Sequence, residues 1–349
     1  MNIGLIFDFA NPVPWRRPGP EVYREALDLA EEVEQLGYDS IWLTEHHFTA
    51  DWNGSSILPI AAAIAARTST IRIGSWALLL PMHDPLRVAE DALAVDQFAD
   101  GRFELGCVAG YRVEEFEGFG ISRKERAARM EEGLSVLQQA FAGEPVTVDG
   151  RIFQYDNVEV TPPPARGNLK VWSGGQAEGP CERAARHRCH LMPSGPFVRP
   201  LYDLYAKQLL AQGDDPAEFG MIGFQPWFVS AAPSKTAPLI EKHLAHRVEA
   251  YRQWYEKAGD FKAMGSGDFV DKGLVAREDD ALGGVLGTPE EIYDSVMEFA
   301  SRAPYSEVIS WVSPTGLDAE TAMESIRLFA REVLPELKKV ERRGVTVDD

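Results

Sequence analysis

The sequence has few cysteines and no pattern that would pair them. Cys107, Cys181 and Cys189 are the three cysteines, and none belongs to a Cys-x-x-Cys pair. So few cysteines, without a pairing pattern, are typical of a protein in a reducing compartment and not of one held together by disulfides. No apolar run is long enough to span a membrane, and the first residues lack the charged and apolar regions of a signal peptide. We therefore expect a cytoplasmic protein that does not enter a membrane.

Basic residues are in the minority. The 349 residues include 35 lysines and arginines against 54 aspartates and glutamates, a formal net charge of −19. Nucleic acids and anionic membranes bind basic surfaces, so we expect neither as a partner. A phosphate-bearing ligand remains compatible with this charge, because backbone N–H groups at a helix N-terminus can bind it.

Several catalytic patterns are absent as well. No Gly-x-Gly-x-x-Gly turn follows an early strand, and no Gly-x-Ser-x-Gly marks a nucleophilic serine. His-x-His and His-Glu-x-x-His, which would place two histidines on one metal, do not occur. We therefore expect no nicotinamide-binding fold, no serine hydrolase triad and no metal site.

The chain does contain a regular alternation of short apolar segments with helical patterns. Buried strands are expected at residues 3–7, 41–43, 71–80, 103–108, 169–173, 189–193, 223–230 and 307–312. Helices are expected at residues 21–36, 57–67, 86–98, 123–141, 200–212, 235–258 and 319–340, with further helices ending near 187 and beginning at 289.

Eight strands that alternate with helices predict the α/β class and a parallel sheet closed into a TIM (β/α)8 barrel. The alternative, an open doubly wound sheet, would carry the glycine-rich turn that is missing here. We expect a hairpin at residues 146–160 as an insertion after the fourth strand, and a Gly-rich lid at residues 261–287 before the eighth. A single domain is expected over residues 1–340, followed by a charged tail at 341–349.

The second strand ends in three ionisable residues, Glu45, His46 and His47. Acid-base groups at the end of a buried strand are typical of the catalytic rim of a β/α barrel. Because successive strand residues face opposite ways, at most one of the two histidines is expected to point into the barrel mouth. The alternative is that both only form hydrogen bonds within a loop.

Two other strand ends have functional character. Ser173, Gly174, Gly175 and Gln176 lie between the fifth strand and a helix, where paired glycines allow a close backbone approach and the helix N-terminus favours a phosphate. An ordinary tight turn is the alternative. After the fourth strand, Arg112 could bind an anion or only pair with Glu114 or Glu115.

Tryptophans mark four of the expected strands and could line an apolar pocket for a flat ring. They are Trp76, Trp172, Trp227 and Trp311.

Short matches to one family run along nearly the whole chain. They are Trp42-Leu43, Glu45-His46-His47-Phe48-Thr49, Ile73-Gly74, Leu80-Pro81, Pro85, Arg87, Glu90-Asp91, Asp96-Gln97, Gly101-Arg102-Phe103, Gly106, Asp268-Phe269-Val270, Lys272-Gly273 and Gly287-Thr288-Pro289-Glu290. With these residues the sequence resembles the bacterial luciferase-like family of flavin-dependent monooxygenases.

The resemblance implies a barrel that binds reduced FMN at the carboxyl ends of its strands and uses O2, through a flavin C4a-peroxide, on a small apolar organic substrate. It also implies a homodimer. Because no nicotinamide fingerprint is present, a separate flavin reductase is expected to supply the reduced FMN.

The resemblance also assigns residues. His46 matches the family's active-site histidine, and Glu45 a position beside the flavin. Trp76 and Ala77 match the site of a non-prolyl cis peptide under the flavin ring. The backbone of Gly174, Gly175, Gln176 and Ala177 matches the phosphate-binding turn.

This sequence departs from luciferase at several of the matched positions. Ala109 stands where luciferase has an arginine near the phosphate, so Arg112 or Arg126 is expected to take that role. Pro180 replaces a hydroxyl residue that contacts phosphate, and Val108 replaces a reactive cysteine.

Two alternatives stay open. One is an F420-dependent oxidoreductase of the same barrel family, which transfers hydride without oxygen. The other is a non-catalytic flavin-binding partner subunit.

Overall fold

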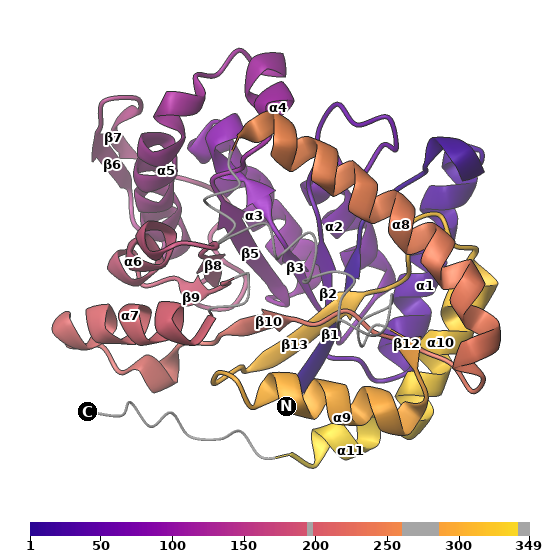
Figure 1. Ribbon diagram of the computed structural model, residues 1–349. Helices are drawn as coiled ribbons and strands as arrows, with labels where there is room; N and C mark the ends of the chain where they lie inside the picture. Colours follow the sequence, from indigo (N-terminus) through magenta and orange to yellow (C-terminus); the bar gives the residue numbers. More distant parts are fainter. Residues whose placement is uncertain (194–197, 260–285, 341–349) are drawn as a thin grey trace.

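Eight parallel strands form a nearly closed barrel, which confirms the predicted TIM-barrel class. The computed structural model of the chain describes residues 1–193, 198–259 and 286–340. The barrel strands are β1 (Asn2–Phe7), β2 (Ser40–Leu43), β3 (Arg72–Ser75), β5 (Phe103–Val108), β8 (Val171–Ser173), β9 (His190–Leu191), β10 (Ile222–Phe224) and β13 (Glu307–Trp311) (Figure 1). Each pairs in parallel with its neighbour, β13 pairs with β1, and a single bridge between Leu191 and Met221 links β9 to the segment before β10.

Helices surround the barrel on its outside. They are α1 (Gly19–Gln35), α2 (Ile57–Arg67), α3 (Pro85–Ala99), α5 (Arg126–Phe141), α6 (Glu178–Arg186), α7 (Val198–Ala211), α9 (Pro289–Ala300), α10 (Ala319–Glu332) and α11 (Leu334–Lys338). The expected hairpin is present as β6 (Val146–Asp149) and β7 (Gln154–Val158). No helix within the described ranges is long and apolar enough to cross a membrane.

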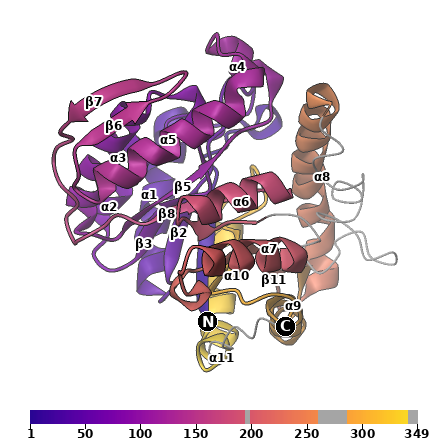
Figure 2. The same cartoon turned by 90° about the vertical axis from the view of Figure 1, so that its left-hand side faces the viewer.

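One long helix, α8 (Pro233–Ala258), has a different place. It runs diagonally from the upper middle to the right-hand side of the molecule in Figure 1 and stands along one edge in Figure 2. Its side chains contact the loops that follow β1, β2 and β5, so it covers the carboxyl ends of these strands. The expected lid falls largely on residues 260–285, and the tail on 341–349, both outside the described residues.

Some element boundaries differ from the expected ones. The strand expected at 71–80 is divided into β3 and β4 (Leu78–Leu79), with the cis Trp76–Ala77 peptide between them. The strand expected at 223–230 is divided into β10 and β11 (Phe228–Val229), and β11 pairs with a short strand, β12 (Leu286–Gly287).

Further differences concern helices. The acidic, aromatic segment after β5 forms a helix, α4 (Val113–Gly118), that the sequence analysis did not predict. The helix expected at 319–340 ends at Glu332, and α11 follows it with Pro335 in its first turn. Proline has no backbone N–H, so it fits that first turn but not the interior of one continuous helix. The helix expected to begin at residue 289 does so as α9, where Thr288 and Glu291 form a capping box.

Large apolar side chains fill the inside of the barrel. They are Ile6, Trp42, Trp172, Met192, Ile222 and Ile309. The rings of Trp42 and Trp172 meet edge to face, with centroids 5.8 Å apart. A Cβ atom at Gly74 would lie 2.3 Å from the Trp42 ring, so only glycine leaves room for this tryptophan.

Below these rings lies a buried cluster of charged groups at the amino ends of the strands. Arg72 of β3 pairs with Glu104 of β5 at 3.3 Å and also with Glu307 of β13. The indole N–H groups of Trp172 and Trp42 donate to Glu104 (2.8 Å) and Glu307 (3.1 Å). Burial would raise the pKa of Glu104, but Arg72, Lys170 and the Trp172 hydrogen bond hold it below its usual value.

Removing the Arg72 charge leaves two carboxylates buried together, so Arg72→Met should lower the free energy of unfolding by about 3 kcal/mol or more. Urea denaturation at neutral pH measures the change. Arg67→Met is the matched control, because Arg67 pairs with Asp28 and Glu31 on the outer surface. It should cost less than about 1 kcal/mol. Equal effects of the two substitutions would contradict a central role for the cluster.

Candidate active site

His46 lies beneath α8 at the carboxyl end of β2. Its Nε2 atom is 3.2 Å from the Tyr251 hydroxyl, and its ring centroid is 5.0 Å from that of Trp254. Its Nδ1 atom is 3.5 Å from Glu115 and has no hydrogen-bond partner among the described residues. A buried imidazole nitrogen in this state is free to exchange a proton or a hydrogen bond with a ligand.

Glu115, on the short helix α4, joins three parts of this site. One carboxylate oxygen accepts hydrogen bonds from the backbone N–H of His47 and from Arg112 Nη1, both at 3.0 Å, and faces His46. Burial would raise the pKa of Glu115, but nearby His46, Arg112 and the His47 N–H hold it below its usual value. Glu115 is therefore an anion at neutral pH, and it can stabilise a protonated His46.

Arg112 is buried and engaged inside the protein. Besides Glu115, it donates to the His47 carbonyl oxygen at 2.7 Å, and its guanidinium lies 4.4 Å from the centre of the Trp254 ring. The sequence left open whether Arg112 binds an anion or pairs with a nearby glutamate. In the structure it forms an ion pair with Glu115. Its Nε atom has no hydrogen-bond partner among the described residues.

The two adjacent histidines diverge. The His47 Nε2 atom lies 3.2 Å from Glu45 Oε1, and its ring meets Phe119 edge to face at 4.7 Å. His47 therefore faces away from Tyr251 and Trp254. This arrangement agrees with the alternation of side chains along an extended chain.

Glu45 is buried between β4 and these histidines. It accepts a hydrogen bond from the backbone N–H of Leu79, and His83 Nε2 lies 3.1 Å from its other oxygen. Burial would raise the pKa of Glu45, but His47, His83 and the Leu79 N–H lower it to about 2. Glu45 thus connects the end of β2 with the strand that follows the Trp76–Ala77 peptide.

Apolar side chains cover the barrel interior near this rim. They are the partly buried Trp76, Ala77, Val108, Phe224 and Trp311. Trp172 lies deeper, and its indole is bound to Glu104. The expectation that Trp227 lines the same pocket is wrong, because it stacks on Phe329 of α10 at 4.8 Å, outside the barrel.

The turn from Gly174 to Ala177 leads from β8 into α6. A Cβ atom at Gly174 would lie 2.5 Å from the Met192 carbonyl oxygen, whereas at Gly175 only the Pro180 ring is near, at 3.2 Å. Both glycines have positive φ angles, 158° and 155°, that other residues rarely adopt. Burial raises the pKa of Tyr255 on α8 to about 12, and hydrogen bonding with Tyr111 and Gln176 reduces that rise. Helix α8 therefore reaches from His46 to this turn.

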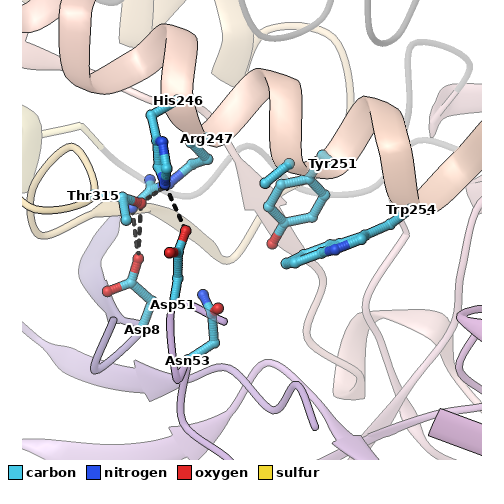
Figure 3. Close-up of a pocket in the computed structure, with 9 residues that line it drawn as sticks. Asp8, Asp51, Asn53, His246, Arg247, Tyr251, Trp254 and Thr315 are labelled. Carbon is cyan, nitrogen blue, oxygen red and sulfur yellow. Dashed lines mark hydrogen bonds and ion pairs between the residues drawn. The ribbon is translucent and has the colours of Figure 1, made fainter. Parts of the chain in front are cut away.

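Ion pairs hold α8 on the rim (Figure 3). Arg247 pairs with Asp8 at 2.6 Å, and His246 with Asp51 at 2.5 Å. The cavity between these residues has a volume of about 10 Å³, room for one water molecule but not for a substrate.

A larger hollow of about 590 Å³ opens on the His47 side of the rim. This aromatic hollow is lined by Tyr23, His47, Phe48, Thr49, Trp52, Ser55, Ser56, His83 and Phe119. Its volume is in the range of small-molecule sites.

Four residues of this site were not predicted from the sequence: His83, Tyr251, Trp254, and Glu115 as the partner of His46. The sequence signal for Glu115 and His83 was weak, an acidic segment after one strand and a histidine beside Asp84-Pro85 after another. Tyr251 and Trp254 are 205 or more positions away from His46, so no local spacing could join them to it.

The fold is an α/β barrel of the kind that enzymes use, and the candidate site lies at its carboxyl rim. A sequence model of the luciferase-like monooxygenase family matches residues 1–305. The chain therefore belongs to the luciferase-like monooxygenase family, as its sequence motifs predict.

Comparison with individual proteins gives the same result. The 4-hydroxyprotoasukamycin monooxygenase of Streptomyces nodosus subsp. asukaensis is 28% identical over 335 residues, which cover 91% of this chain and 87% of that protein. The crystal structure of monooxygenase RslO1 from Streptomyces bottropensis superposes with a TM-score of 0.77 at 22% identity, over 97% of this chain and 100% of that one.

Two further structures share the fold but differ in cofactor. The oxygenating constituent of 3,6-diketocamphane monooxygenase from Pseudomonas putida, in complex with FMN, has a TM-score of 0.75 at 18% identity, over 96% of this chain and 98% of that one. The F420-dependent tetrahydromethanopterin reductase of Methanopyrus kandleri has a TM-score of 0.67 at 19% identity, over 96% and 99%. At such identities the likeness concerns the fold alone.

Glu115→Gln tests the importance of the buried carboxylate. It leaves Arg112 buried without its anion, so it should lower the free energy of unfolding by about 3 kcal/mol. Glu114→Gln is the matched control on the same helix, because Glu114 pairs with Lys257 at the surface. The control should cost less than about 1 kcal/mol in the same denaturant titration. A larger loss for Glu114→Gln would contradict our description of α4.

Proposed function

We propose that this protein is an FMN-dependent monooxygenase that takes reduced FMN from a separate flavin reductase and uses O2 on a small apolar organic substrate. The observation that carries the proposal is the environment of His46: a largely covered imidazole whose buried Nδ1 atom is unpartnered among the described residues, beside the Glu115 carboxylate, at the rim of a luciferase-like barrel. We further propose a homodimer, following the family resemblance.

The residues present fit a flavin. Trp76, Ala77, Phe224 and Trp311 offer an apolar rim for a flat ring. Besides His46 Nδ1, the buried Arg112 Nε and Trp311 Nε1 atoms have no hydrogen-bond partner among the described residues. Buried polar atoms are rarely left so, and a ligand with ring nitrogens and carbonyl groups would supply partners.

Each group then has a proposed role. The turn at Gly174, Gly175, Gln176 and Ala177 binds the phosphate with its backbone N–H groups. The positive charge of the buried Arg112 stabilises the negative charge of the phosphate. Glu45 holds the segment that carries Trp76 and Ala77 in place through the Leu79 N–H. When bound, reduced FMN supplies the electrons that activate O2.

The chain's own chemistry is the control of a proton. His46 holds or releases a proton at Nδ1 or Nε2, and Glu115 stabilises the protonated ring. Tyr251 and Trp254 cover the imidazole and exclude bulk water from it. These roles require α8 to remain on the rim.

A hydride-transferring F420 enzyme is the second candidate, because F420-dependent enzymes share this fold. Oxygen consumption separates the two. Reduced FMN bound to the protein should react with O2 in a rapid-mixing experiment and give a transient flavin absorbance distinct from the reduced and oxidised forms. Tight F420 binding without oxygen consumption would favour the alternative.

A non-catalytic flavin-binding partner subunit is the third possibility. It predicts that the isolated chain binds flavin but gives no product with any reductase and substrate. Turnover by the isolated chain would exclude it.

The phosphate turn can be tested at Gly175. Gly175→Asp should weaken FMN binding more than tenfold, about 1.4 kcal/mol, because the carboxylate crowds and repels a phosphate dianion. Gly175→Ala is the control that adds bulk without charge, and it should weaken binding less. A flavin fluorescence titration measures both. Unchanged affinity in Gly175→Asp would place the phosphate elsewhere on the rim.

His46→Ala tests the proton-controlling group. The variant should still bind FMN, because phosphate and ring contacts remain, but product formation should fall by about 100-fold or more. Hydrogen peroxide should become the main product of flavin oxidation. His47→Ala should reduce product formation less, because its side chain faces Glu45 rather than α8. The reverse order of the two variants would transfer the catalytic assignment to His47.

A further inference from the structure

A second cluster of side chains lies beside the flavin site and has the composition of a metal centre. Glu45 and His47 at the end of β2 meet His83 from the segment before α3, and their ligand atoms all lie within 4.8 Å of one another. Both histidine Nε2 atoms approach the same carboxylate oxygen, at 3.2 Å for His47 and 3.1 Å for His83. The sequence pattern could not predict this set, because its third member comes from a different loop.

These distances suit shared coordination. Two ligand atoms about 2.0–2.1 Å from one zinc ion, at a tetrahedral angle, lie roughly 3.3 Å apart. A pair of atoms at that spacing can also be a hydrogen bond. His83 Nε2 makes such a hydrogen bond with Glu45 Oε1, so the case for a shared ion depends on the direction of the His47 ring nitrogen.

His47 supplies that direction. Its side chain is 7% exposed, and its Nε2 atom has no hydrogen-bond partner among the described residues although Glu45 Oε1 is 3.2 Å away. The ring nitrogen therefore does not point at the carboxylate oxygen. Ligands of one metal ion behave in this way, because their lone pairs point at a common centre rather than at each other.

The second carboxylate oxygen of Glu45 orients the group. It accepts the Leu79 N–H, which leaves Oε1 turned toward the two imidazoles. Outer hydrogen bonds of this kind hold the ligands of metal sites in place.

The cluster also has an entrance. His47 and His83 both line the aromatic hollow, and the His83 side chain is 30% exposed. An ion could enter from this hollow, and water or a small anion could occupy its remaining coordination positions.

We propose that Glu45, His47 and His83 bind one divalent transition-metal ion with an open coordination position toward the aromatic hollow. Two histidines and one glutamate form the donor set of open zinc sites, and two histidines and a carboxylate that of non-haem iron sites. The site is separate from His46, which faces Tyr251, so metal binding does not depend on the flavin chemistry proposed above.

The test uses untagged, chelator-treated protein without flavin. Titration with Zn²⁺ in a calorimeter should show one ion bound per chain, and Co²⁺ should give visible d–d absorption bands. His83→Ala and His47→Ala should each weaken Zn²⁺ binding at least 100-fold. Because His83 is partly exposed, its variant is expected to fold, and circular dichroism checks this.

His187→Ala is the matched control. His187 pairs with Glu131 at 2.9 Å, a histidine–glutamate contact without a second histidine, and its loss should leave Zn²⁺ binding unchanged. Absence of stoichiometric Zn²⁺ binding by the unaltered chain would overturn the proposal and identify the cluster as a hydrogen-bonded clamp. Binding that survives both His83→Ala and His47→Ala would overturn it as well.

Discussion

The closed barrel depends on neutralising charge inside its own wall. Arg72 lies between Glu104 and Glu307, which come from strands on opposite sides of it in the sheet. The indoles of Trp42 and Trp172 complete the hydrogen bonding of these carboxylates and fill the space above them. Because two buried anions without a cation would be very unfavourable, the three charges and the two rings form one unit. The floor of the candidate active site therefore rests on packed aromatic rings.

At the opposite end, α8 converts an open rim into a covered site. Its contacts with Asp8 and Asp51 fix one half of the helix, and Tyr251 and Trp254 in the other half rest on His46. Ile240 and Leu244 of the same helix also pack with Phe228, Leu317 and Ala322, so an apolar cluster anchors α8 as well as the ion pairs. A cover held in this way keeps bulk water from the carboxyl rim beneath it.

The rim holds two chemical environments within three consecutive residues. His47 and His83 line the aromatic hollow and contact the buried Glu45, whereas His46 faces Glu115 and α8. Extended backbone produces this division, since neighbouring side chains leave it in opposite directions. Glu115 couples the two sides, because it binds the His47 N–H while facing the His46 ring. A change on one side can thus reach the other through one carboxylate.

The sequence by itself determined the barrel class, most strands and helices and the luciferase-like family, because these depend on local periodicity and contiguous motifs. It also singled out the Glu45–His46–His47 stretch as a candidate site. The tertiary structure alone decided which groups meet. Glu115 and Tyr251 reach His46 only through the folding of α4 and α8 over the rim, and His83 joins Glu45 from another loop. It also decided that Trp227 lies outside the barrel and that Arg112 pairs internally. Contacts between residues distant in sequence depend on how helices and strands pack together, so the spacing of residues within one segment cannot predict them.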